Sequence, residues 1–90
     1  MLKTQMSEAA SCPLCSTAAM RDTHSGGDGY RYRCAACSGM FEFGANAQAR
    51  ADRGQLHPDV APSVRALLAE RKVPRVEFTA GEFSVRIVQD

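Results

Sequence analysis

The placement of the cysteines constrains this chain more than any other feature. All four cysteines of the 90-residue sequence fall into two Cys-x-x-Cys pairs, Cys12/Cys15 and Cys34/Cys37, and the 18 residues 16–33 separate the pairs. This spacing is typical of zinc sites in which each pair forms a tight turn and directs two thiolates at one ion. Because four thiolates leave no open coordination position, the spacing predicts one structural Zn²⁺ rather than a catalytic metal.

Three other uses of the thiols remain open. Two disulfides would need an oxidising compartment, whereas the N-terminus lacks the apolar stretch of a secretory signal, so we expect a cytoplasmic protein. A redox dithiol of the thioredoxin kind would need a strand–helix pattern around one pair, and neither pair shows it. An iron site of the rubredoxin kind uses the same ligands, although Ser16 and Ser38 stand where rubredoxin-like sequences carry glycine.

Size and charge exclude several classes of protein. Ninety residues bury only a modest core, and a net charge of +1 gives no overall field for binding nucleic acid or anionic membranes. The apolar stretches are far too short for a membrane span. The sequence contains no Ser/His/Asp set, paired carboxylates or phosphate-binding loop, and His24 and His57 are isolated, so we expect no enzymatic activity.

The residues between and after the cysteine pairs predict short antiparallel strands. Residues 25–29 hold three glycines and an aspartate, which is typical of a hairpin tip. Tyrosine and arginine alternate over 30–33, and phenylalanine alternates with other residues over 40–43, as expected of strands with one buried face. We therefore expect a small α+β protein that begins with a flexible tail over 1–11 and a zinc ribbon of three short antiparallel strands over 12–43.

The ribbon segment resembles a known family. The sequences Cys12-Pro13-Leu14-Cys15 and Tyr32-Arg33-Cys34-Ala35-Ala36-Cys37, with a glycine-rich gap between them and Phe41 after them, resemble the pattern Cys-Pro-x-Cys … Tyr-x-Cys-x-x-Cys-Gly-x-x-Phe. Zinc ribbons with this pattern open insertion-element transposases and occur in phage and bacterial transcription regulators, including, more loosely, the Ogr/Delta activators. The chain departs from the pattern at Ser38, which replaces glycine. The resemblance implies structural zinc and a regulator that binds nucleic acid.

The sequence of the second half of the chain predicts a linker over 44–58 and a further folded unit over 59–90. An apolar side chain recurs with helical spacing at Val60, Val64, Leu67 and Leu68. This helix should end before Pro74, and residues 75–79 and 83–88 alternate around a glycine-containing turn, which predicts a C-terminal β-hairpin. A helix and two strands bury too little surface alone, so we expect the unit to pack on the ribbon, to form a homodimer or to rest on a partner.

Two functions are compatible with the sequence. In the first, the ribbon binds nucleic acid and three arginines contact phosphates: Arg21, Arg31 and Arg33. The net charge of +3 over residues 44–75 could extend such a patch or be an ordinary solvated surface. Tyr30 and Tyr32, beside arginines, have the pattern of a surface that stacks on bases. They are equally expected in the core, because so small a module has few other apolar side chains. In the second, the zinc is purely structural, and the C-terminal helix and hairpin edge form a protein-interaction adaptor.

Overall fold

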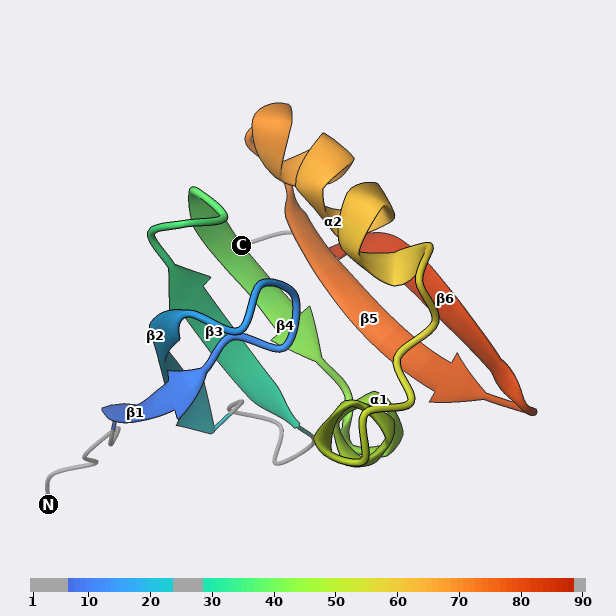
Figure 1. Ribbon diagram of the computed structural model, residues 1–90. Helices are drawn as coiled ribbons and strands as arrows, with labels where there is room; N and C mark the ends of the chain where they lie inside the picture. The colour runs from blue at the N-terminus through green and yellow to red at the C-terminus, as the bar shows by residue number, and fades with distance from the viewer. Residues whose placement is uncertain (1–6, 24–28, 89–90) are drawn as a thin grey trace, which may run out of the picture.

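Strands that follow one another in the sequence also lie side by side in space. The computed structural model describes residues 7–23 and 29–88 and contains one six-stranded sheet in the order β1-β2-β3-β4-β5-β6 (Figure 1). The strands are β1 (Ser7–Ser11), β2 (Ala18–Thr23), β3 (Tyr30–Cys34), β4 (Gly39–Phe43), β5 (Val73–Thr79) and β6 (Glu82–Val88). Neighbouring strands are antiparallel except β4 and β5, which are parallel. The predicted small α+β class is thereby confirmed.

Two helices occupy the crossover between the parallel strands. They are α1 (Ala45–Asp52) and α2 (Val60–Ala69), and both pack on the same face of the sheet (Figure 1). That face carries the aromatic side chains of β3 and β4, and the rings of Tyr32 and Phe41 stack with centroids 5.4 Å apart. The apolar side of α2 covers them with Val60, Val64 and Leu68, all buried. Neither helix in the described part of the chain has the length or apolar character needed to cross a bilayer.

The layout differs from the predicted one in two segments. Residues 7–11, expected in a flexible tail, form β1 and pair with β2, because the first cysteine turn folds the chain back on itself. Within 44–58, expected as a linker, α1 forms because its alternate alanines favour a helix and Ala47 is fully buried. Residues 1–6, His24 and residues 25–28 of the expected hairpin tip lie outside the described residues.

The parallel pairing of β4 and β5 joins the two halves of the chain in one sheet. Glu42 lies opposite Arg75, and Phe43 lies opposite Val76, whose carbonyl oxygen accepts a 2.9 Å hydrogen bond from the amide of Gly44. The expected ribbon and the expected C-terminal unit therefore share backbone hydrogen bonds as well as a core.

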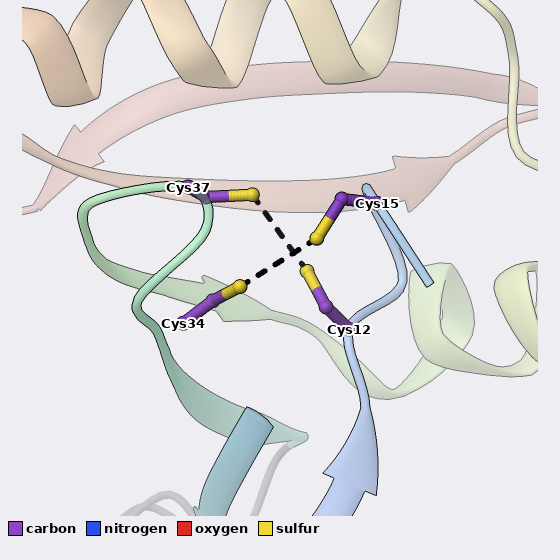
Figure 2. Close-up of side chains that lie close together, drawn as sticks. All are labelled: Cys12, Cys15, Cys34 and Cys37. Atoms are coloured by element: carbon purple, nitrogen blue, oxygen red, sulfur yellow. Dashed lines mark hydrogen bonds between the residues drawn. The ribbon is translucent and has the colours of Figure 1, made fainter. Parts of the chain in front are cut away.

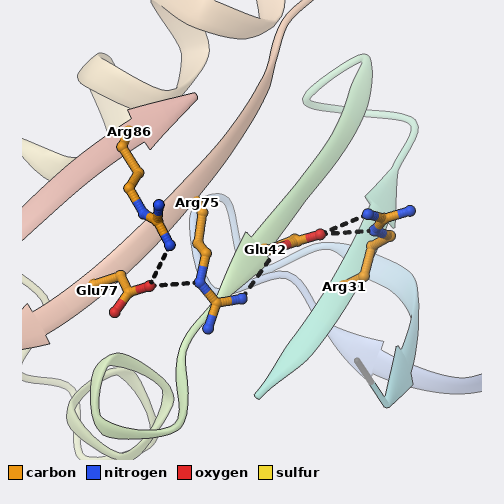
Figure 3. A network of polar contacts seen from close by, with 5 residues as sticks. All are labelled: Arg31, Glu42, Arg75, Glu77 and Arg86. Carbon is orange, nitrogen blue, oxygen red and sulfur yellow. Dashed lines mark hydrogen bonds and ion pairs between the residues drawn. The ribbon is translucent and has the colours of Figure 1, made fainter. Parts of the chain in front are cut away.

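A chain of ion pairs crosses this junction on the face opposite the aromatic core (Figure 3). Arg75 donates from Nη1 to Glu42 Oε1 at 3.0 Å and from Nε to Glu77 Oε2 at 2.6 Å, while Arg31 donates to Glu42 Oε2 at 2.6 Å. The side chains of Glu42 and Arg75 are only 2% and 7% exposed. Hydrogen bonding from Arg75, helped by Arg86, holds the pKa of Glu77 below its usual value. The network therefore places buried charge where the two halves of the sheet meet.

Candidate metal centre

The two cysteine pairs sit in turns that each end in a serine with the same left-handed backbone conformation. The first turn follows β1, and its Ser16 amide donates to the carbonyl oxygen of Cys12 at 2.8 Å. The second joins β3 to β4, and its Ser38 amide donates to the carbonyl oxygen of Ala35 at 3.1 Å. Ser16 and Ser38 have φ angles of 66° and 65°, in the left-handed region that favours glycine. These serines thus adopt the conformation for which related patterns use glycine.

The turns bring all four sulfur atoms to one point (Figure 2). The four Sγ atoms lie within 4.8 Å of one another, with 3.8 Å between Cys12 and Cys37 and 3.6 Å between Cys15 and Cys34. A tetrahedral ion bound by thiolates at about 2.3 Å requires sulfur atoms about 3.8 Å apart. All four cysteines are free thiols, so the described structure contains no disulfide between them. The cluster therefore has the dimensions of a site for one metal ion.

The protein environment treats the four thiols differently. Cys12, Cys34 and Cys37 are buried, and burial raises the pKa of Cys12 and of Cys37. Cys15 is more accessible, and a hydrogen bond with the hydroxyl of Thr17, 3.0 Å from its Sγ, lowers the pKa of Cys15 to about 6. Cys15 therefore loses its proton more readily than Cys12 and Cys37, which would release their protons as a metal binds.

Helix α2 packs beside this cluster, which is one of the three arrangements expected for the C-terminal unit, although the sequence did not indicate the contacting residues. Arg65 donates from Nη2 to the carbonyl oxygen of Leu14 at 3.3 Å, so it holds the first cysteine turn. Leu68 packs so closely on Gly39 that a Cβ atom there would lie 2.8 Å from its Cδ2. Gly39 directly follows the second turn. The only sequence signal for this contact is that glycine, because no spacing rule links the helix to the cysteines.

The three arginines predicted to contact nucleic acid do not form one cluster. The strand register places Arg31 and Arg33 on one face of the sheet and Arg21 on the other, beside Tyr32. Arg21 donates to Glu8 at 2.6 Å, and its guanidinium lies 4.0 Å from the centre of the Tyr30 ring. Arg31 is held by Glu42. Arg33 is half exposed and lies 3.7 Å from a carboxylate oxygen of Asp22, so each arginine has an acidic neighbour.

The two tyrosines are also not equivalent. Tyr32 is only 1% exposed, and this burial raises the pKa of its hydroxyl. The hydroxyl donates a 2.6 Å hydrogen bond to Gln48 of α1. Tyr30 is half-buried and meets Tyr32 edge to face with ring centroids 6.4 Å apart. Tyr32 is therefore a core residue that ties α1 to the sheet.

A groove of about 880 Å³ lies between α2 and the β5–β6 hairpin. Its floor includes the rings of Phe78 and Phe83, whose centroids are 4.7 Å apart and which remain half-buried. The guanidinium of Arg50 lies 4.4 Å from the centre of the Phe78 ring. Further apolar lining comes from Leu67, Val60 and Val85, and a polar rim includes His57, Asp59 and Glu82. The sequence predicted the helix and the hairpin but not that their contact would leave a cavity.

Comparisons with known proteins do not assign the chain to a family. A search of family models, of curated proteins and of solved structures found no match to the chain. The four-cysteine cluster is consistent with a site of the zinc-ribbon kind. What the protein does must therefore be argued from the cluster, the groove and the surface charges.

Proposed function

We propose that the chain is a protein-interaction adaptor stabilised by one structural Zn²⁺. Cys12, Cys15, Cys34 and Cys37 hold the ion, and the groove between α2 and the β5–β6 hairpin binds an apolar segment of another protein. The observation that carries the proposal is the groove itself, a concave apolar surface of the size that binding sites usually have.

The donor set and its surroundings support zinc in a structural role. Four thiolates form a closed shell, so a bound ion would have no position for substrate or water. The cluster also lies where β1, the β3–β4 turn and α2 meet, so an ion there would fix three parts of the fold. Metal binding of this kind contributes folding energy directly.

The chemistry of the groove supports a protein partner. Two aromatic rings form its floor, and their half-burial leaves apolar area that a partner side chain would remove from water. Polar side chains that line the groove, among them Arg50, His57 and Glu82, can bond to polar groups that flank an apolar anchor. An aromatic or branched anchor with polar neighbours is the arrangement typical of interface hot spots.

A matched pair of helix variants tests the groove. Ala66 and Ala69 are both exposed on α2, but only Ala66 lines the groove. We expect Ala66→Arg to fill the groove with a charged side chain and reduce partner capture about tenfold or more, while Ala69→Arg leaves it unchanged. Arginine is a good helix former, so neither change should disturb α2. The measurement is affinity capture from native lysate with the zinc-loaded chain, followed by quantitative mass spectrometry.

Nuclease and salt controls separate this function from binding to nucleic acid. Capture through the groove should persist after nuclease treatment and at high salt, because it depends on apolar contact rather than on phosphate charge. Equal capture by the Ala66→Arg and Ala69→Arg variants, or no specific capture by the unmodified chain, would contradict the adaptor function.

Binding of nucleic acid is a second candidate, and exposed cations favour it. Arg65, Arg71 and Lys72 are exposed on α2 and the turn that follows it, and within residues 7–23 and 29–88 none of them forms an ion pair. The half-exposed side chain of Arg33 lies on the face of the sheet opposite the one that α2 covers, so it would contact phosphates as part of a separate surface. Arg31 is less suitable, because removing it would leave buried Glu42 with one arginine fewer.

A mobility-shift series tests this second candidate. Arg33→Ala, and separately Arg71→Ala with Lys72→Ala, should weaken binding to duplex DNA or RNA. Each lost phosphate contact should flatten the dependence of log affinity on log salt by about one unit. Exposed arginines seldom contribute more than about 0.5 kcal/mol to stability, so thermal unfolding should be unchanged. The absence of binding by the intact protein at low salt would exclude this function.

A further inference from the structure

Strand β6 ends the sheet with an unpaired edge. Among the described residues, no strand lies on its outer side, and all seven of its residues pair with β5. Ile87 on this strand is 47% exposed, one of two large hydrophobic side chains in the described part of the chain that remain so accessible. The opposite edge, β1, has the sequence Ser-Glu-Ala-Ala-Ser and no large apolar side chain. A long apolar edge strand is a ready template for pairing with another chain.

The hairpin turn fixes which backbone groups of β6 point outward. Ala80 and Gly81 both have positive φ angles, 55° and 81°, as in a type I′ turn, so the carbonyl of Thr79 accepts from the amide of Glu82. Hydrogen-bonded and non-bonded pairs then alternate along the hairpin. The outward amides and carbonyls therefore belong to Phe83, Val85 and Ile87. Pro74, which has no amide hydrogen, lies opposite Ile87, as this alternation allows.

We propose that β6 binds β6 of a second copy of this chain, antiparallel, with Val85 of each copy opposite the other. In this register Phe83 of one copy faces Ile87 of the second, so every outward amide and carbonyl of the strand meets a partner. A slip of one residue would set outward groups against inward ones. A slip of two in one direction would leave Ile87 opposite Gly81 in the turn, and in the other direction it would set Arg86 opposite Arg86 of the second copy, where like charges repel. The proposal does not rest on what occupies the groove.

The side chains are also self-complementary in this register. On the face covered by α2, exposed Ile87 would pack on half-buried Phe83 of the second copy, as apolar cross-strand pairs do. On the other face, Ser84 would lie opposite Arg86, so no like charges meet directly. The contact is small for a stable interface, which predicts a dimer that dissociates on dilution. A strand from an unrelated protein would need to reproduce this pattern, whereas a second copy carries it already.

Charge reversal at the two-fold position tests both the dimer and its register. The molar mass of the zinc-loaded full chain, measured by sedimentation from micromolar to near-millimolar concentration, should rise from 9.7 kDa toward twice that value. Val85→Lys alone and Val85→Glu alone should each weaken self-association about tenfold or more, because two like charges would face each other. An equimolar mixture of the two variants should restore the dimer.

A backbone variant provides a second, independent readout. Val85→Pro removes one outward amide without removing a hydrogen bond to β5, so it should abolish the dimer while amide chemical-shift dispersion shows an intact sheet. If this variant does not fold, the lysine and glutamate pair decides. The proposal is overturned if the unmodified chain stays monomeric throughout the range. It is equally overturned by a dimer that persists in both single charge variants.

Discussion

Chelation of the metal is expected to unfold the whole described sheet rather than the cysteine turns alone. Three of the four thiols are buried, and a bound ion is what would hold the four sulfur atoms within 4.8 Å of one another. The first cysteine turn contacts α2 through the carbonyl oxygen of Leu14, and Gly39 after the second turn contacts it through Leu68. Strand β4, which also follows the second turn, pairs with β5. Loss of amide chemical-shift dispersion over residues in both halves of the chain, on titration with EDTA, is the measurement.

Two controls make the chelation experiment specific. Addition of Zn²⁺ in excess over the chelator should restore the original spectrum, because metal binding and folding are one event in sites of this kind. Cys12→Ser should reproduce the unfolded spectrum without chelator, whereas Ser11→Ala, at the exposed residue beside it, should not. Dispersion that survives complete removal of the metal would show that the core is sufficient alone and would contradict the structural role.

Replacement of Arg75 by alanine is expected to be strongly destabilising. Arg75 is 7% exposed and bridges Glu42, 2% exposed, to Glu77 across the junction of the two halves. Removing one member of a buried ion pair leaves the other charge without compensation and costs about 3–5 kcal/mol. Because Glu42 keeps Arg31, we expect the lower end of this range. Urea unfolding of the zinc-loaded protein measures the loss.

Arg86 provides the matched control for this change. It belongs to the same network and donates to Glu77 at 3.2 Å, but its side chain is 63% exposed. Solvent screens such a pair, so Arg86→Ala should change the free energy of unfolding by less than about 1 kcal/mol. Similar effects of the two substitutions would contradict the account of the junction, because burial is what separates them.

Local pattern predicted the parts of the fold that depend on neighbouring residues. The cysteine spacing indicated the two turns, the Tyr-Arg alternation indicated β3, and the helical spacing of Val64 and Leu68 indicated the buried side of α2. In each case the relevant residues lie within one element or at a defined motif spacing. The sequence therefore predicted a small α+β protein with a four-cysteine cluster.

Contacts between distant segments could not be predicted in this way. Glu42 alternates with two phenylalanines, a pattern that indicates an exposed position, yet it is buried because Arg75, 33 residues away, lies opposite it. Strand β1 is built of small residues without apolar alternation, and its pairing follows from the turn after it. The acidic neighbours of Arg21 and Arg33, Glu8 and Asp22, likewise become apparent only from the strand register.

The metal content of the protein purified without added metal tests the central claim most directly. Elemental analysis by mass spectrometry should give one zinc atom per chain, and all four cysteines should stay unreactive toward a thiol reagent until a chelator is added. Cys34→Ser should lose that zinc. Stoichiometric iron, disulfide-bonded cysteines, or zinc that is retained after the loss of Cys34 would contradict a structural zinc centre formed by these four residues.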